Sequence, residues 1–427
     1  MNTLTALLAI TPTTIAGIAH TDGMNQEDPY AIMEVLVAPH GSDERQFGKN
    51  VELIGDWIAI ATDTGKDGSL QPGSVLLYDL ADPGRRPEEV LRAPDRNWPD
   101  EFGSDMAASG RRLLIGAPGD SEADWDSGAA WLYELEDDWS LVSSLQPKVV
   151  ESGARFGDAV AIDGDWVAIG SPRSDGSGIA SGAVHLFDGR SGSWRESQCI
   201  QAPDGASGDF FGDSLALCGK WLAVGSWGDD DRGEKSGSVW IFHLEREGWR
   251  AVQKLAPLEL QSRDLFGCSL GLSDEWLLVG SSGWNTNQGA IHAFKLEDST
   301  WRRKRLLRAP GGTSEEWLGY SLAMNRSLMV AGAPARRSGT TMNGGIDLFK
   351  LEADTWHWVQ RVEPSGKDWR QPNQFGWSVA TDGRRVMVGR IDDADDEAEA
   401  GRAWRIEPRK DVHSISVVLP GLIGRGR

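Results

Sequence analysis

The sequence predicts an all-β fold, a seven-bladed β-propeller made of four-stranded antiparallel blades. A Phe-Gly pair, replaced by Leu-Gly in one copy, recurs at intervals of 52 to 57 residues. Each copy contains four short apolar runs separated by turn residues, which is the pattern of a small antiparallel sheet. A repeat of this length with four strands per copy is typical of propellers or solenoids. The copies begin at Phe47, Phe102, Phe156, Phe211, Phe266, Leu318 and Phe375.

The third copy shows the four strands most clearly. Apolar runs at 159–162 and 166–169 flank an Asp-Gly-Asp tight-turn sequence, as in a hairpin. A longer loop rich in glycine, serine and aspartate precedes the third run at 183–187. A second turn precedes the fourth run at 194–200. No segment of the chain has the apolar periodicity of a helix over ten or more residues, so strands and turns account for the pattern.

Two further positions keep phase with the Phe-Gly pair. Fourteen residues after the phenylalanine, glycine occupies every copy except the first, which has Ala61. A second glycine follows in all seven copies, at Gly73, Gly128, Gly182, Gly237, Gly289, Gly344 and Gly401. Because the offsets persist through seven copies, chance composition does not explain them.

The ends of the repeat region favour a closed ring over a solenoid. Six copies finish with a fourth strand that ends in proline, but the seventh has only a third strand, near 401–408. The missing strand matches residues 31–39, which read AIMEVLVAP and lie just before the first copy. We therefore expect residues 31–39 to pair with residues 401–408, since a closed ring protects the free strand edges.

The propeller predicted for residues 31–408 leaves three other segments. Residues 1–19 resemble a signal peptide, with Gly17-Ile18-Ala19 similar to a cleavage site, although the leading region lacks Lys and Arg. They are interpreted as an export signal, with an unprocessed tail as the alternative. Residues 20–30 form a polar lead-in, and residues 409–427 form a tail. No run is long and apolar enough to span a membrane. The expected location is extracellular or in the cell envelope.

Composition narrows the possible partners and chemistry. The formal net charge of −21 argues against nucleic acid or an anionic membrane surface as a partner. Cys199, Cys218 and Cys268 have no metal or redox spacing, and buried free thiols are expected for the last two. The seven histidines do not cluster in the sequence, and no nucleophile elbow or phosphate loop is present. The sequence therefore predicts no catalytic residues, no metal and no cofactor. We also expect the protein to be a monomer.

The 20 tryptophans suggest a binding surface only after the repeated positions are set aside. Twelve of them occupy three slots of the repeat, and we expect these to pack within or between blades. Strand alternation places the second-to-third-strand loops and the crossover loops between blades on one side, which we call the long-loop face. Variable loops on a rigid scaffold often carry binding sites. The candidate ligand-binding residues are Trp125, Trp227, Trp284, Asp229, Asp230 and Asp231. Alternatively, these side chains fold down over the loop bases.

The repeat resembles a known family. Phe-Gly is followed fourteen residues later by Gly116-Ala117-Pro118, by Gly332-Ala333-Pro334, or by the variant Gly170-Ser171-Pro172. This combination resembles FG-GAP repeats, which form the seven-bladed head of integrin α subunits and occur in many bacterial extracellular proteins. The resemblance implies ligand binding on the long-loop face. Many members also bind calcium between the first two strands, but the short turns here lack enough oxygen ligands for it.

Three functions follow from these observations. The first is a non-catalytic exported propeller that binds a protein or a glycan through its long-loop face, in adhesion or envelope assembly. The second is a polysaccharide hydrolase or lyase with carboxylates near the propeller axis, because glycoside hydrolysis uses a pair of carboxyl groups. The third is a purely structural repeat module.

Overall fold

The computed structural model describes residues 28–38, 46–62, 73–81, 87–94, 100–338, 341–364, 374–391 and 401–409. The predicted leader at 1–19, most of the tail at 409–427 and the acidic run at 392–399 lie outside these residues. Trp98 and Trp369 lie outside them as well. In the described part of the chain, no helix is long and apolar enough to cross a membrane.

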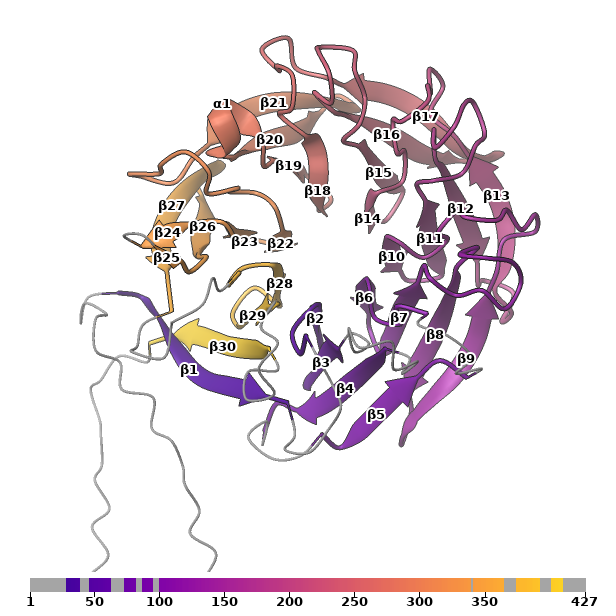
Figure 1. Ribbon diagram of the computed structural model, residues 1–427, viewed down its shortest axis with the longest axis horizontal. Helices are drawn as coiled ribbons and strands as arrows, with labels where there is room; N and C mark the ends of the chain where they lie inside the picture. Colours follow the sequence, from indigo (N-terminus) through magenta and orange to yellow (C-terminus); the bar gives the residue numbers. More distant parts are fainter. Residues whose placement is uncertain are drawn as a thin grey trace, which may run out of the picture.

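Seven four-stranded antiparallel sheets surround a central axis, which confirms the predicted fold (Figure 1). The first strand of each blade lies nearest the axis, and the fourth lies on the outside. Blades one to three comprise β2 (Val51–Ile54), β3 (Trp57–Thr62), β4 (Ser74–Asp79), β5 (Glu89–Arg92), β6 (Met106–Ser109), β7 (Arg112–Ala117), β8 (Ala129–Leu135), β9 (Trp139–Leu145), β10 (Val160–Asp163), β11 (Trp166–Ser171), β12 (Ala183–Asp188) and β13 (Arg195–Ile200). Blades four and five comprise β14 (Ser214–Cys218), β15 (Trp221–Ser226), β16 (Ser238–Glu245), β17 (Gly248–Leu255), β18 (Phe266–Leu272), β19 (Trp276–Ser281), β20 (Ala290–Glu297) and β21 (Thr300–Leu307). Blades six and seven comprise β22 (Leu322–Asn325), β23 (Leu328–Gly332), β26 (Ile346–Glu352), β27 (Thr355–Val362), β28 (Ser378–Thr381), β29 (Val386–Arg390), β30 (Arg402–Pro408) and β1 (Tyr30–Val37).

The N-terminal strand β1 closes the ring as the fourth strand of blade seven. It pairs antiparallel with β30, from Tyr30 opposite Pro408 to Val37 opposite Arg402. Figure 1 shows the two strands, from opposite ends of the described chain, side by side. Gln360 of blade six forms two hydrogen bonds with the Tyr30 backbone, at 2.8 and 3.0 Å. Gln198 forms the same pair of bonds with Trp249, the residue near the start of the fourth strand in blade four. Tyr30 therefore takes the place that tryptophan holds in other blades.

Glycine permits the close approach of neighbouring blades. The second glycine of one blade forms a bridge with the Phe-Gly phenylalanine of the next, as in Gly182 with Phe211. The same bridge joins Gly401 to Phe47 and so completes the ring. A Cβ atom on Gly182 would overlap the backbone carbonyl oxygen of Phe211, and its φ of +87° is in the left-handed region. Both the space and the backbone conformation therefore require glycine at this position.

The apolar core is divided among the blade interfaces. Within the described residues, buried apolar side chains form seven clusters, each spanning two neighbouring blades. At four interfaces a second-strand tryptophan meets a fourth-strand tryptophan of the next blade edge to face, with centroids 5.5–6.2 Å apart. This geometry is favourable for aromatic pairs. The predicted packing role of the tryptophans in these two slots is confirmed.

The loops add short elements that the sequence does not predict. β24 (Arg337–Ser338) and β25 (Thr341–Met342) form a small hairpin in blade six, and α1 (Trp284–Asn287) is a four-residue helical segment in blade five. Asn285 and Thr286 within α1 have φ angles of 50° and 62°. The segment is therefore a tight irregular turn, which is too short to produce a helical sequence pattern.

Replacing Gly182 by alanine tests the close contact between blades three and four. Gly192 is the control, because its φ of +80° is similar but a Cβ there would meet nothing within 4 Å. Gly192→Ala should lower the free energy of unfolding by only about 1–2 kcal/mol, through backbone strain. Gly182→Ala should lower the free energy of unfolding by roughly 2–5 kcal/mol, because the two blades must also move apart. Urea unfolding measures both values. Equal losses would show that the contact between blades does not require glycine.

Candidate functional site

A channel of about 760 Å³ runs along the axis and is lined by the first strands of all seven blades. Each first strand begins on the long-loop face, just after its Phe-Gly pair. The second residue after each phenylalanine therefore lies in a ring at this end of the channel. We call this ring the axial mouth, and its members are Lys49, Ser104, Asp158, Asp213, Cys268, Tyr320 and Trp377. Farther along the strands, the lining is mostly alanine and aliphatic residues.

Aromatic side chains lie at two parts of the axial mouth. In blade four, Trp227 stacks on Phe210, with ring centroids 4.9 Å apart and an interplanar angle of 13°. The Lys235 ammonium lies 5.2 Å from the centroid of the Trp227 ring. Between blades six and seven, the Tyr320 and Trp377 rings are 4.8 Å apart. The axial mouth thus combines flat apolar surfaces with the polar groups of its other members.

Asp213 has the most unusual environment in the axial mouth. Burial raises the pKa of its carboxyl to about 7, and the nearby charge of Asp158 adds to this effect. A hydrogen bond from the Trp227 indole and the charges of Arg155 and Arg173 oppose the increase. Near neutral pH, Asp213 therefore exists as a mixture of its protonated and charged forms.

Asp158 occupies the same slot in the neighbouring blade but has a strong ionic partner. The Arg155 guanidinium lies 3.0 Å from the Asp158 carboxylate and 2.7 Å from that of Glu101. Burial would raise the pKa of Glu101, but Arg155 lowers it below its usual value. These contacts connect the crossover segments of blades two and three, so Arg155 has a structural role beside the axial mouth.

Two more carboxyl groups lie farther inside the channel. Asp105 accepts hydrogen bonds from the Asn50 amide at 3.1 Å and from the Val160 N–H at 2.8 Å, and so joins three blades. Burial raises the pKa of Asp105 to about 6 despite these bonds. Burial also raises the pKa of Glu52 to about 8, with a further contribution from Asp105. Glu52 is therefore mainly protonated at neutral pH.

The three candidate tryptophans occupy different environments on the long-loop face. Trp125 is 68% exposed in the loop of blade two. Trp227 lies at the axial mouth, as described above. Trp284 is partly buried and packs edge to face on His292, with centroids 5.4 Å apart. Among the described aromatic contacts, none joins these three rings to one another.

The candidate aspartates organise the loop that carries them. Asp229 is 4% exposed and lies 2.7 Å from the Lys254 ammonium, which also contacts Asp231 at 2.8 Å. The Asp230 carboxylate accepts the Lys235 backbone N–H at 2.6 Å. Burial would lower the pKa of Lys254, but its hydrogen bonds to Asp204 and to the two aspartates raise it above its usual value. The single positive charge of Lys254 is thus shared among three aspartates and balances only part of their negative charge.

Sequence reasoning missed the axial mouth as a unit, although the repeat contains a signal for it. The Phe-Gly or Leu-Gly pair before each slot repeats from blade to blade, whereas the slot itself holds lysine, serine, aspartate, cysteine, tyrosine or tryptophan. Variation at a position that faces a common cavity is the pattern expected of a site on a repeated scaffold.

Comparison with known families gives a specific match. Residues 87–133, 139–187 and 194–242 match the FG-GAP repeat. A search of curated proteins finds no match to the chain. Each matched segment extends from the fourth strand of one blade through the third strand of the next. This is the same one-strand offset by which β1 completes blade seven.

The environment of Asp213 predicts a titration near neutral pH. In a ¹⁵N-tryptophan NMR spectrum, the Trp227 indole resonance should move with a midpoint near pH 7, because its acceptor gains charge as the pH rises. Trp227→Phe assigns the resonance, and Asp213→Asn should abolish the movement. A Trp227 resonance that stays constant from about pH 5 to about pH 9 would contradict the assigned interaction.

The same group makes stability depend on pH. The pKa of Asp213 is raised in the folded protein above its unfolded value of about 3.9. Its stabilising contribution is therefore complete below about pH 4 and is lost as the pH rises through about 7. Urea unfolding should show Asp213→Asn becoming more stable relative to the native chain over this interval. A constant difference between the two proteins would contradict the shifted pKa.

Proposed function

We propose that this propeller of FG-GAP repeats is a non-catalytic, exported binding module that holds a protein or glycan on its long-loop face. An FG-GAP propeller is a binding or structural repeat module. The observation that carries the binding proposal is the axial mouth. It is a recess on a rigid scaffold that combines aromatic surfaces with a few oriented polar groups, as ligand sites commonly do.

Exposed apolar side chains on the long-loop face support a large binding partner. Trp125, Val149, Ile179 and Leu258 are 68–82% exposed, and all belong to second-to-third-strand or crossover loops. The Gly153 N–H donates to the Trp125 carbonyl oxygen at 2.7 Å, which joins the blade-two loop to the following crossover. Apolar groups on connected loops favour contact with a macromolecule, in adhesion or envelope assembly.

The proposed location is outside the cell or in its envelope. The support is the signal-like pattern of residues 1–19, together with the common occurrence of FG-GAP repeats in extracellular proteins. Partner chemistry is restricted by the net charge of −21, which opposes binding to nucleic acid or to an anionic membrane surface.

Asp213 supports a second candidate function, polysaccharide hydrolysis or elimination. A carboxyl group with a pKa of about 7 in a recess could act as a general acid or base near neutral pH. The nearest carboxylate of the axial mouth, Asp158, is paired with Arg155 and is less suited to the second catalytic role. Binding therefore remains the preferred function.

An array of glycans and surface proteins, probed with the purified chain, tests the binding proposal. For the strongest ligand, Trp125→Ala combined with Trp227→Ala should weaken binding by about 10-fold or more, because aromatic anchors dominate interfaces. Asp213→Asn should weaken the binding of a ligand that enters the axial mouth. Lys220→Ala is the control, since Lys220 is exposed in the tight turn between β14 and β15 at the opposite end.

The outcomes separate the alternatives. Loss of binding in the tryptophan variant, with native circular dichroism and no loss in Lys220→Ala, supports a long-loop binding face. Turnover of a polysaccharide that Asp213→Asn abolishes would establish the enzymatic function instead. Failure of the whole array to bind, with no polysaccharide cleaved, would contradict both and favour a structural module.

A further inference from the structure

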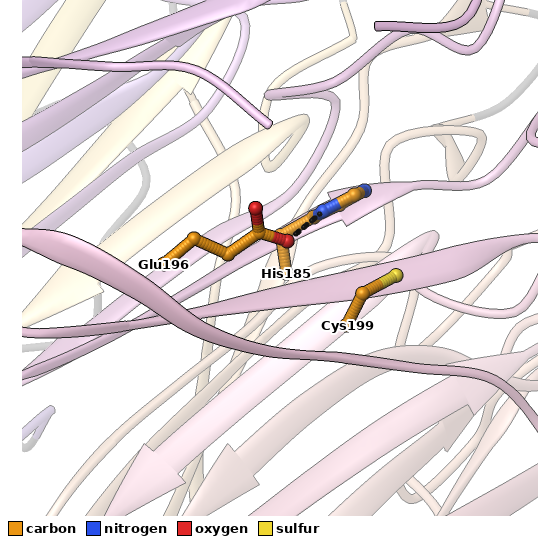
Figure 2. Close-up of side chains that lie close together, drawn as sticks. All are labelled: His185, Glu196 and Cys199. Atoms are coloured by element: carbon orange, nitrogen blue, oxygen red, sulfur yellow. Dashed lines mark hydrogen bonds and ion pairs between the residues drawn. The ribbon is translucent and has the colours of Figure 1, made fainter. Parts of the chain in front are cut away.

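Three potential metal ligands converge on the outer half of blade three (Figure 2). His185 on β12 pairs directly across the sheet with Cys199 on β13. The His185 Nδ1 atom lies 2.9 Å from the Glu196 Oε1 atom. One ligand atom from each of the three side chains lies within 4.8 Å of the other two. Imidazole, thiolate and carboxylate are therefore available around one point.

A β-bulge brings these side chains to one face of the sheet. Residues three apart on a regular strand point to opposite faces, so Glu196 and Cys199 would ordinarily be separated. The register between β12 and β13 shifts at Leu186 and Phe187, which leaves Ser197 as an extra residue. The extra residue reverses the alternation and places Glu196 beside His185. Sequence spacing alone does not reveal this arrangement.

Blade three differs from the other blades at the same positions. Register equivalents of His185, Glu196 and Cys199 are Trp131, Leu141 and Ser144 in blade two. They are Trp240, Ala251 and Lys254 in blade four, and His292, Arg303 and Leu306 in blade five. In blade six they are Asp347, Trp358 and Arg361. Among these blades, only blade three places three possible ligands in the slots, so the repeat scaffold itself does not require them.

Packing orients two of the three side chains. His185 is 8% exposed, and its ring contacts that of Phe156 edge to face at 5.3 Å. The Glu196 side chain is 6% exposed, and one of its oxygens accepts the Lys148 backbone N–H at 2.6 Å. This contact leaves the other oxygen, Oε1, directed at His185. Cys199 is exposed, so the cluster is open to solvent on one side.

We propose that His185, Glu196 and Cys199 bind a divalent transition metal, with zinc as the best chemical fit. Zinc takes nitrogen, sulfur and oxygen ligands at about 2.0–2.3 Å, which places tetrahedral ligand atoms roughly 3–4 Å apart. The His185 and Glu196 atoms are 2.9 Å apart and all three ligand atoms lie within 4.8 Å of one another, so shifts of roughly 1 Å reach this geometry. Three protein ligands leave a fourth position for water or for a group supplied by a ligand. Binding releases the thiol proton and the proton shared by His185 and Glu196 to solvent.

The alternative is a metal-independent hydrogen-bonded cluster that anchors the Lys148 segment to blade three. Both arrangements use the contact between His185 and Glu196, and Cys199 also hydrogen-bonds to His185, but only metal binding forms a bond between the Cys199 thiolate and a metal. Cysteine substitution therefore distinguishes them. Because Cys199 is exposed, its replacement by serine should leave the fold intact.

Titration of the chelator-treated, full-length chain with Co²⁺ provides the test. A bound Co²⁺ should produce a near-ultraviolet thiolate-to-cobalt band that saturates at one equivalent and is displaced by Zn²⁺. Cys199→Ser should remove the band, and His185→Gln should weaken Co²⁺ binding by about 10-fold or more. Cys218→Ser is the matched control, since Cys218 is also a free cysteine and lies in blade four.

The alternative outcomes are clear. A band that is lost in Cys199→Ser and kept in Cys218→Ser supports the site. No saturable band in the native chain, or a band that survives Cys199→Ser, would overturn it. If His185→Gln fails to fold, Glu196→Gln supplies the second ligand test, and native Co²⁺ affinity in that variant would remove Glu196 from the site.

Discussion

The contact between a glycine of one blade and the Phe-Gly backbone of the next sets the geometry of this protein. A side chain on Gly182 would occupy the space of the Phe211 carbonyl oxygen, and equivalent contacts occur around the ring. The bridge from Gly401 to Phe47 makes the last interface the same kind as the others. On the outer strands, the Gln360 side chain hydrogen-bonds to the Tyr30 backbone, as the Gln198 side chain does to the Trp249 backbone. Both the inner and the outer parts of the blades therefore support closure.

This constraint separates structural positions from variable ones. Because glycine and phenylalanine fix the start of each first strand, the residue that follows faces the channel and is free to vary. Asp213, Tyr320 and Trp377 gain a shared location from this arrangement, although they come from three different blades. Positions on the third strands also vary between blades, since His185 occupies a position held by tryptophan in blades two and four. A uniform frame thus supports local chemistry at the axis and on the outer strands.

The sequence predicted the parts that depend on repetition. Closure was predictable because the seventh copy lacks a fourth strand that residues 31–39 resemble, and the packing tryptophans were predictable from their slots. Contacts between side chains at different positions of the repeat could not be predicted from the sequence. Lys254 lies on β17 and Asp229 in the loop between β15 and β16, and only the folded loop brings their charges together. The bulge at Ser197 likewise changes which side chains share a face, without any composition signal. The pairing of Asp213 with Trp227 depends on the spacing of β14 and β15 at the axis, which the repeat does not specify.

Hydrogen exchange of a chain that begins at residue 38 tests ring closure most directly. Without β1, the outer edge of β30 should lose its partners, and the amides of residues 402–407 should exchange faster than in the intact chain. The unfolding midpoint should fall, and a peptide of residues 28–38 added in trans should restore protection. Unchanged protection of β30 together with an unchanged unfolding midpoint would contradict closure by the N-terminal strand.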